Sequence, residues 1–146
     1  MRDHDAGQVR QTVTVPTTIS ALGRIPIPEI PYPRHNRIAP QELTVYRIRG
    51  IIEHISVESD RDWHLIVSDP VDSAATMVVE IPDPSCVADP TLKTELAEVR
   101  RVLHTIPRHG LAEIDGVGFF DFIHTQRGKS RNGFELHPVL ALRRIQ

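Results

Sequence analysis

Alternating hydrophobic and polar residues in the middle of the chain predict three consecutive β-strands. Residues 44–57 are rich in β-branched side chains and contain no proline, which is typical of a long strand, and Gly50 in its middle indicates a bulge or bend. Residues 63–67 and 76–81 alternate with the same period of two and are bounded by turn-forming Asp, Ser and Pro residues. Each of these strands therefore has one apolar face and one polar face.

The hydrophobic spacing then changes and predicts one helix followed by two more strands. Asp89 precedes a proline, which is a typical helix start, and leucine and valine recur after it at helical spacing. This predicts a helix over 90–106. Two further strands are expected over 111–122 and 134–145, with a charged loop between them.

This order of elements predicts the fold class. Three strands, a helix and two strands, with a long bent first strand, is the arrangement of the OB-fold, a five-stranded partly open Greek-key barrel. We expect a mainly β protein with one helix, an OB-like five-stranded Greek-key barrel in the order β-β-β-α-β-β, preceded by a proline-rich extended arm. The expected divisions are a disordered N-terminus over 1–15, the arm over 16–43 and the barrel domain over 44–146.

The arm has two interpretations. Six of the twelve prolines lie between Pro16 and Pro40, so this stretch lacks donors for a helix or a central strand. It could pack on its own domain through its apolar residues, which are Ile25, Ile27, Ile30 and Tyr32. Alternatively, it could dock on a protein partner, because residues 28–31 have the P-x-x-P spacing.

Composition excludes several classes of protein. The 146 residues, 40% hydrophobic and 25% charged, are enough for one small core, and the net charge of −2 provides no overall positive field for nucleic acid or acidic lipid. Cys86 is the single cysteine and cannot form an internal disulfide. No apolar run is long enough for a membrane span, and the N-terminus has no signal pattern, so we expect a soluble cytoplasmic protein without a membrane partner.

Histidines and carboxylates on the polar faces of the expected strands suggest a metal site. Imidazole and carboxylate groups are ligands for zinc and other divalent ions, although no local metal-binding motif is present. We expect no obligatory cofactor, and a divalent metal is the alternative. The candidates are His64, Glu80, Asp121, His124, Glu135 and His137, of which His124, Glu135 and His137 form the expected nucleus, with Glu80 reaching across the barrel.

The loop between the last two strands holds a local cluster of cations. Three basic residues within five positions, with a glycine among them, suit a phosphate group or an acidic surface. In OB-folds this loop contacts ligands, and an aromatic side chain could provide a stacking surface for a base. The expected ligand-binding residues are Arg127, Lys129, Arg131 and Asn132 of the loop, together with Trp63.

Five segments resemble a family of small bacterial proteins of uncharacterised function. They cover residues 38–46, 62–69, 77–86, 116–121 (GVGFFD) and 132–138 (NGFELHP), of which the last two are the most specific. The resemblance extends from about residue 17 to 145 and implies the same strand order, but no activity and no catalytic residue.

These observations favour a non-enzymatic OB-like binding module. Its ligand would be an oligonucleotide or another anionic partner, contacted by the 125–132 loop and the barrel face. A metal-dependent hydrolase that uses the histidine and carboxylate cluster is one alternative. A structural or assembly protein that docks through its proline-rich arm is another.

Overall fold

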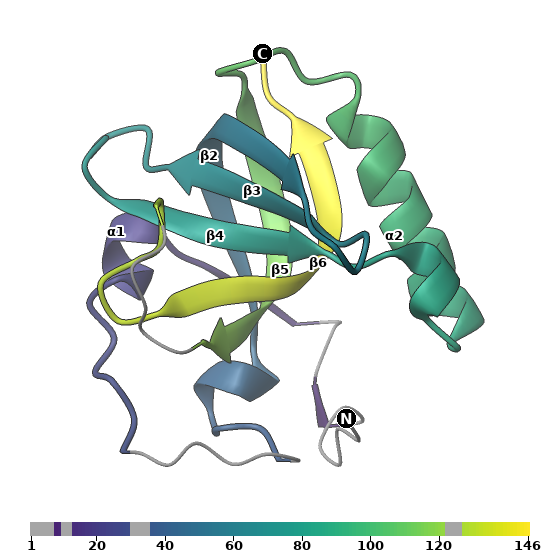
Figure 1. Ribbon diagram of the computed structural model, residues 1–146. Coiled ribbons are helices and arrows are strands. Elements are labelled where there is room, and N and C mark those ends of the chain that lie inside the picture. The colour runs from purple at the N-terminus through teal and green to yellow at the C-terminus, as the bar shows by residue number, and fades with distance from the viewer. Residues whose placement is uncertain (1–7, 10–12, 30–35, 122–126) are drawn as a thin grey trace.

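The computed structural model describes residues 8–9, 13–29, 36–121 and 127–146, which form a β-barrel with one long helix at its side (Figure 1). The observed order of elements contains the predicted β-β-β-α-β-β arrangement. In chain order the elements are β1 (Thr14–Pro16), α1 (Ile19–Leu22), η2 (Gln41–Leu43), β2 (Val45–Val57), β3 (Trp63–Ser68), β4 (Thr76–Ile81), η3 (Pro84–Cys86), α2 (Pro90–Leu103), β5 (Leu111–Phe120) and β6 (Phe134–Arg144).

Five strands close the barrel. Their order is β2-β3-β4-β6-β5, and β5 pairs with β2 to complete the ring. All pairs are antiparallel except β4 with β6, which run parallel. The short strand β1 lies outside the ring and pairs in parallel with the start of β2. The OB-like barrel predicted from the sequence is therefore confirmed.

The long strand β2 takes part in both halves of the barrel. Its residues Val45 to Ile51 pair with β5, and its residues from Ile51 onward pair with β3. Gly50 lies at this change of partner, and a Cβ there would be only 3.1 Å from the Cβ of Val67. A Cβ at this position would force the Val67 side chain to shift, so a glycine suits this close approach of β2 and β3.

Helix α2 covers the barrel core with one apolar stripe. It begins after Asp89, whose side chain accepts a hydrogen bond from the backbone N–H of Thr91. Leu96, Val99 and Leu103 are buried in the core, as the helical spacing predicted. The helix ends at Leu103 rather than at residue 106, because the chain continues from there in tight turns.

The inner and outer faces of the strands differ as the alternation predicted. The inner residues of the strands join those of α1 and α2 in one core. On the outer face of β3, β4, β6 and β5, polar side chains alternate along each strand with the residues that point into the core. The strand residues in the core are Ile48, Ile52, Leu65, Val67, Met77, Val79, Ile81, Ala112, Ile114, Phe120, Phe134, Leu136, Val139 and Leu142.

The N-terminal segment differs from the extended chain expected before residue 44. Thr14 and Val15, within the stretch expected to be disordered, belong to β1, and the range 16–43 contains α1 and η2. Helix α1 forms because Thr18 caps it and because Ile19 and Leu22 are buried in the barrel core. Ile25 packs on this core whereas Ile27 is exposed, and Ile30 and Tyr32 lie outside the described residues.

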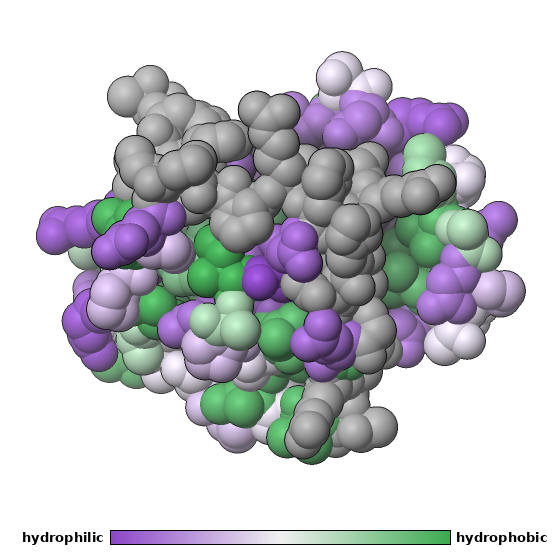
Figure 2. All heavy atoms as spheres, turned by 90° about the horizontal axis from the view of Figure 1, so that it is seen from below, coloured by the Kyte–Doolittle hydropathy of each residue, from purple (hydrophilic) through white to green (hydrophobic). Residues whose placement is uncertain are grey.

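The face seen in Figure 2 shows hydrophobic and hydrophilic side chains interspersed among the described residues. This is the mixture usual for protein surfaces. Among the helices that the structure describes, none has the length and apolar character to cross a membrane.

Candidate functional site

The pairing of three strands brings a group of acidic and imidazole side chains together on the outer face of the barrel. His64 of β3 pairs with Glu80 of β4. On the other side of β4, Val79 is aligned with Leu136 of the parallel strand β6. The next residue on each strand points outward, so Glu80 lies beside His137.

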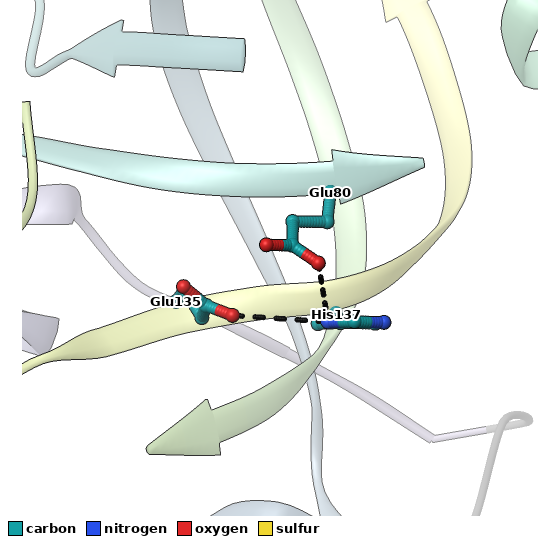
Figure 3. A group of neighbouring side chains, drawn as sticks. All are labelled: Glu80, Glu135 and His137. Carbon is teal, nitrogen blue, oxygen red and sulfur yellow. Dashed lines mark ion pairs between the residues drawn. The ribbon is translucent and has the colours of Figure 1, made fainter. Parts of the chain in front are cut away.

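Glu80, Glu135 and His137 form the centre of this group, and their side chains point toward one another (Figure 3). His137 Nδ1 lies 2.6 Å from Glu80 Oε2 and 3.7 Å from Glu135 Oε1. One ligand atom from each residue lies within 4.8 Å of the others. We call these three residues the Glu–Glu–His centre.

Burial and charge determine how these groups ionise. Burial disfavours the charged form of His137, but its contacts with Glu135 and Glu80 outweigh burial and raise its pKa to about 10. Burial raises the pKa of the Glu135 carboxyl, although the contact with His137 opposes this. The contacts with the two carboxyl groups therefore favour the protonated form of His137.

His64 extends the group on the side of β3. Its Nε2 lies 2.8 Å from Glu80 Oε1, the carboxylate oxygen that faces away from His137. Its Nδ1 is buried and makes no hydrogen bond within the described ranges, and Glu58 Oε1 lies 3.6 Å from it. His64 thus fixes the orientation of the Glu80 carboxylate.

Residues 127–130, which precede β6, lie on the other side of the group. The side chain of Lys129 is only 7% exposed and forms an ion pair with Asp121, and its Nζ lies 3.8 Å from Glu135 Oε2. Gly128 has a φ of +84° and lies directly on Ile66 of β3, where a Cβ would be 2.6 Å from the Ile66 Cγ2. This described part of the loop therefore packs on the outer face of the barrel.

Two residues predicted to bind ligand have structural contacts in the barrel. The Asn132 side chain is buried and donates hydrogen bonds to the carbonyl oxygens of Leu22 and Ile25, at 2.8 and 3.0 Å. Trp63 belongs to the opposite face of β3 from His64 and packs against α2, with the Arg100 guanidinium 4.6 Å from its ring centre. Neither side chain is placed to stack or bind on the outer face beside the loop.

Two of the predicted loop residues have exposed side chains. Arg127 and Arg131 are exposed, and neither has an ion pair or hydrogen bond within the described part of the chain. Lys129, between them in the sequence, points inward to the acidic groups. The loop thus offers two guanidinium groups to solvent rather than three cations.

The predicted metal ligands are brought together in part, and in a different way from the prediction. Glu80 does not reach across the barrel, because β4 is the direct neighbour of β6. Asp121 is linked to the centre through Lys129, and His64 through Glu80. His124, which was expected in the nucleus, lies outside the described residues. Strand alternation predicted the faces of these residues, but not which strands are neighbours.

Comparisons with known proteins support the fold. No model of a known protein family matches the sequence, and no curated protein is significantly similar to it. Two OBody proteins, each in a structure bound to hen egg-white lysozyme, have TM-scores of 0.52 and 0.50 at 14% and 15% identity. These matches cover 70% of this chain and 82% and 80% of the OBody chains.

A larger protein contains a similar unit. A putative aspartyl-tRNA synthetase from Leishmania major Friedlin has a TM-score of 0.57 at 11% identity. The match covers 94% of this chain but only 22% of the synthetase. At these identities the likeness establishes the fold alone, so the class defined by the structure is an OB-like barrel. The resemblance to a bacterial family stays a prediction.

Proposed function

We propose that this protein is a non-enzymatic OB-fold binding module that binds single-stranded nucleic acid through Arg127 and Arg131. In OB-folds, oligonucleotides bind on the face of the second and third barrel strands and at the loops beside it. Here these strands are β3 and β4, and the loop between β5 and β6 lies against them. The two arginines therefore project from the part of the fold that binds ligands elsewhere.

The observation that carries this proposal is that the two exposed arginines stand on residues 127–133, where the side chains of Lys129, Ser130 and Asn132 contact the rest of the structure. Lys129 is buried in ion pairs below the loop. Ser130 donates a hydrogen bond to the carbonyl oxygen of Phe134, and Asn132 ties the loop to the segment that follows α1. A segment held by such contacts loses little conformational entropy on binding, which favours phosphate recognition by arginine.

The charge of the molecule restricts the binding mode. The net charge is −2 and the outer face beneath the loop is acidic, so nucleic acid would be attracted at the loop and not along the whole barrel. A synthetase that carries a similar barrel is named for its tRNA, which supports nucleic acid as the ligand class. Two phosphate contacts predict weak binding that depends on salt.

The test is the fluorescence anisotropy of labelled single-stranded DNA and RNA at several salt concentrations. Replacing both arginines by alanine should weaken binding and reduce the salt slope by about 1.4 units, because each phosphate contact to a single strand contributes about 0.7. The matched control is R101A with R108A, which removes two exposed arginines from the region of α2 and the turn after it. This control should bind as the wild type does.

Two results would contradict the proposal. One is the absence of wild-type binding to either nucleic acid at low salt. The other is an equal loss of affinity in the loop variant and in the control variant, because binding would then depend on total charge rather than on the loop.

A further inference from the structure

The Glu–Glu–His centre has the donor atoms of a metal site. Glu80 and Glu135 each direct one carboxylate oxygen toward His137 Nδ1, as the close-up in Figure 3 shows. We propose that these three residues bind a divalent transition-metal ion such as Zn²⁺. This inference is independent of the nucleic-acid proposal, because it uses none of the exposed arginines.

The distances are close to those that an ion requires. In tetrahedral zinc sites with bonds of about 2.0–2.2 Å, neighbouring ligand atoms lie about 3.3–3.5 Å apart. His137 Nδ1 and Glu135 Oε1 are separated by 3.7 Å. His137 Nδ1 and Glu80 Oε2 are 2.6 Å apart and need to separate by about 0.7–0.9 Å to reach that spacing, which a small side-chain rotation provides. The ion takes the place of the proton between them.

The charge around the centre favours a dication. Glu80 and Glu135 are 8% and 3% exposed, and buried carboxylates need compensating positive charge. The carboxyl groups of Glu80, Glu135 and Asp121 lie around the ammonium group of Lys129. A divalent ion at the centre would add positive charge among these carboxyl groups.

Neighbouring side chains already orient the ligands. His64 Nε2 holds Glu80 Oε1 at 2.8 Å and leaves Oε2 facing His137. Lys129 lies on the side of Glu135 Oε2 and leaves Oε1 facing the same nitrogen. Partners of this kind fix ligand carboxylates in metal sites, and their loss typically weakens metal binding by about 10- to 100-fold.

The donor set also distinguishes between ions. One imidazole with two carboxylates suits zinc and other transition metals, whereas magnesium and calcium prefer oxygen ligands throughout. The side chain of His137 is 33% exposed, so a water molecule can reach the centre and provide a fourth ligand. An affinity for Zn²⁺ without a matching effect of Mg²⁺ is therefore expected.

The experiment measures zinc binding to chelator-stripped protein by competition with a zinc-sensitive dye at neutral pH. Wild type should bind one equivalent, and E135Q and H137Q should each bind at least about tenfold more weakly. H109Q is the matched control, because His109 Nδ1 is paired with Glu53 at 2.8 Å on the surface and no third ligand joins them among the residues that the structure describes. Its affinity should equal that of the wild type.

Thermal unfolding provides the second measurement. Zn²⁺ should raise the melting temperature of wild type and H109Q but not that of E135Q. An ion that binds the folded state more tightly than the unfolded state stabilises the protein, and E135Q lacks one ligand of the folded site. Mg²⁺ should have no such effect. If H137Q fails to fold, the E135Q variant provides the test. Its glutamine side chain has nearly the same size and shape as the glutamate that it replaces. The proposal is overturned if wild type binds no zinc at micromolar concentration, or if E135Q binds zinc as wild type does.

Discussion

Asp69 connects the turn after β3 to helix α1. It is buried, and its carboxylate accepts hydrogen bonds from the backbone N–H groups of Ser20, Val71 and Asp72. Burial opposes ionisation, but these three donors outweigh it and lower the pKa of Asp69 below 3.8. The ionised carboxylate is thus the form that the folded state stabilises.

The stability of the protein should therefore fall in acid through Asp69. A lowered pKa contributes stability that is fully present above the unfolded value of 3.8 and is lost as the pH falls through the folded value. Asp69→Asn should be less stable than wild type at neutral pH and should lose less stability below pH 3.8. Urea unfolding at several pH values measures this.

The control for Asp69 is Asp60→Asn, which alters an exposed carboxylate in another turn. It should follow the pH dependence of the wild type. Identical pH dependence of wild type and Asp69→Asn would show that Asp69 has no such role.

Some side-chain roles could be read from the sequence and others could not. The period of two placed His64 and Glu80 opposite the apolar positions of their strands and put Glu135 and His137 on one face of theirs, and the structure has all four on the outer face. The burial of Lys129 and Asn132 could not be predicted. It depends on residues far away in the sequence, and a loop composition alone does not reveal these partners.

The bounds of the long strands were predicted closely, because the alternation of hydrophobic and polar residues extends over many positions. The strands over 44–57, 63–67, 76–81 and 134–145 agree with β2, β3, β4 and β6 to within one residue at each end. The short elements β1, α1 and η2 were missed. Three or four residues carry too little periodicity, and contacts with β2 and the core stabilise the first two.

Helix α2 should contribute to stability through its buried stripe. Leu96 has 0% exposure, so Leu96→Ala should lower the free energy of unfolding by about 2–5 kcal/mol, the range for removing a buried leucine. Lys93→Ala, at an exposed position of the same helix, should change it by no more than about 0.5 kcal/mol. Urea unfolding of both variants measures this difference, and equal effects would contradict it.

The whole molecule includes the N-terminal segment in its core. Ile19 and Leu22 are 1% and 2% exposed, and the carbonyl oxygens of Leu22 and Ile25 accept hydrogen bonds from Asn132. The boundary expected at residue 44 thus separates residues that pack together. Sequence composition marked the prolines of this segment, but not the few apolar residues by which it joins the barrel.

Shortening the chain to residues 44–146 should therefore destabilise the barrel. Two buried aliphatic side chains contribute about 1.5–3 kcal/mol each, so the loss should be about 3–6 kcal/mol. Removing only residues 1–12 is the control and should leave Ile19 and Leu22 in place. Comparison of urea midpoints measures both effects, and a 44–146 chain as stable as the full chain would show that the segment is dispensable.

The position of β6 between β4 and β5 has a consequence for the growing chain on the ribosome. β6 is synthesised after both of the strands that it joins. Until β6 pairs with them, β4 and β5 each have one backbone edge without a partner strand. Such edges favour pairing with other nascent chains. Pairing of β6 with β4 and β5 therefore removes these exposed edges, and it also brings Glu135 and His137 beside Glu80.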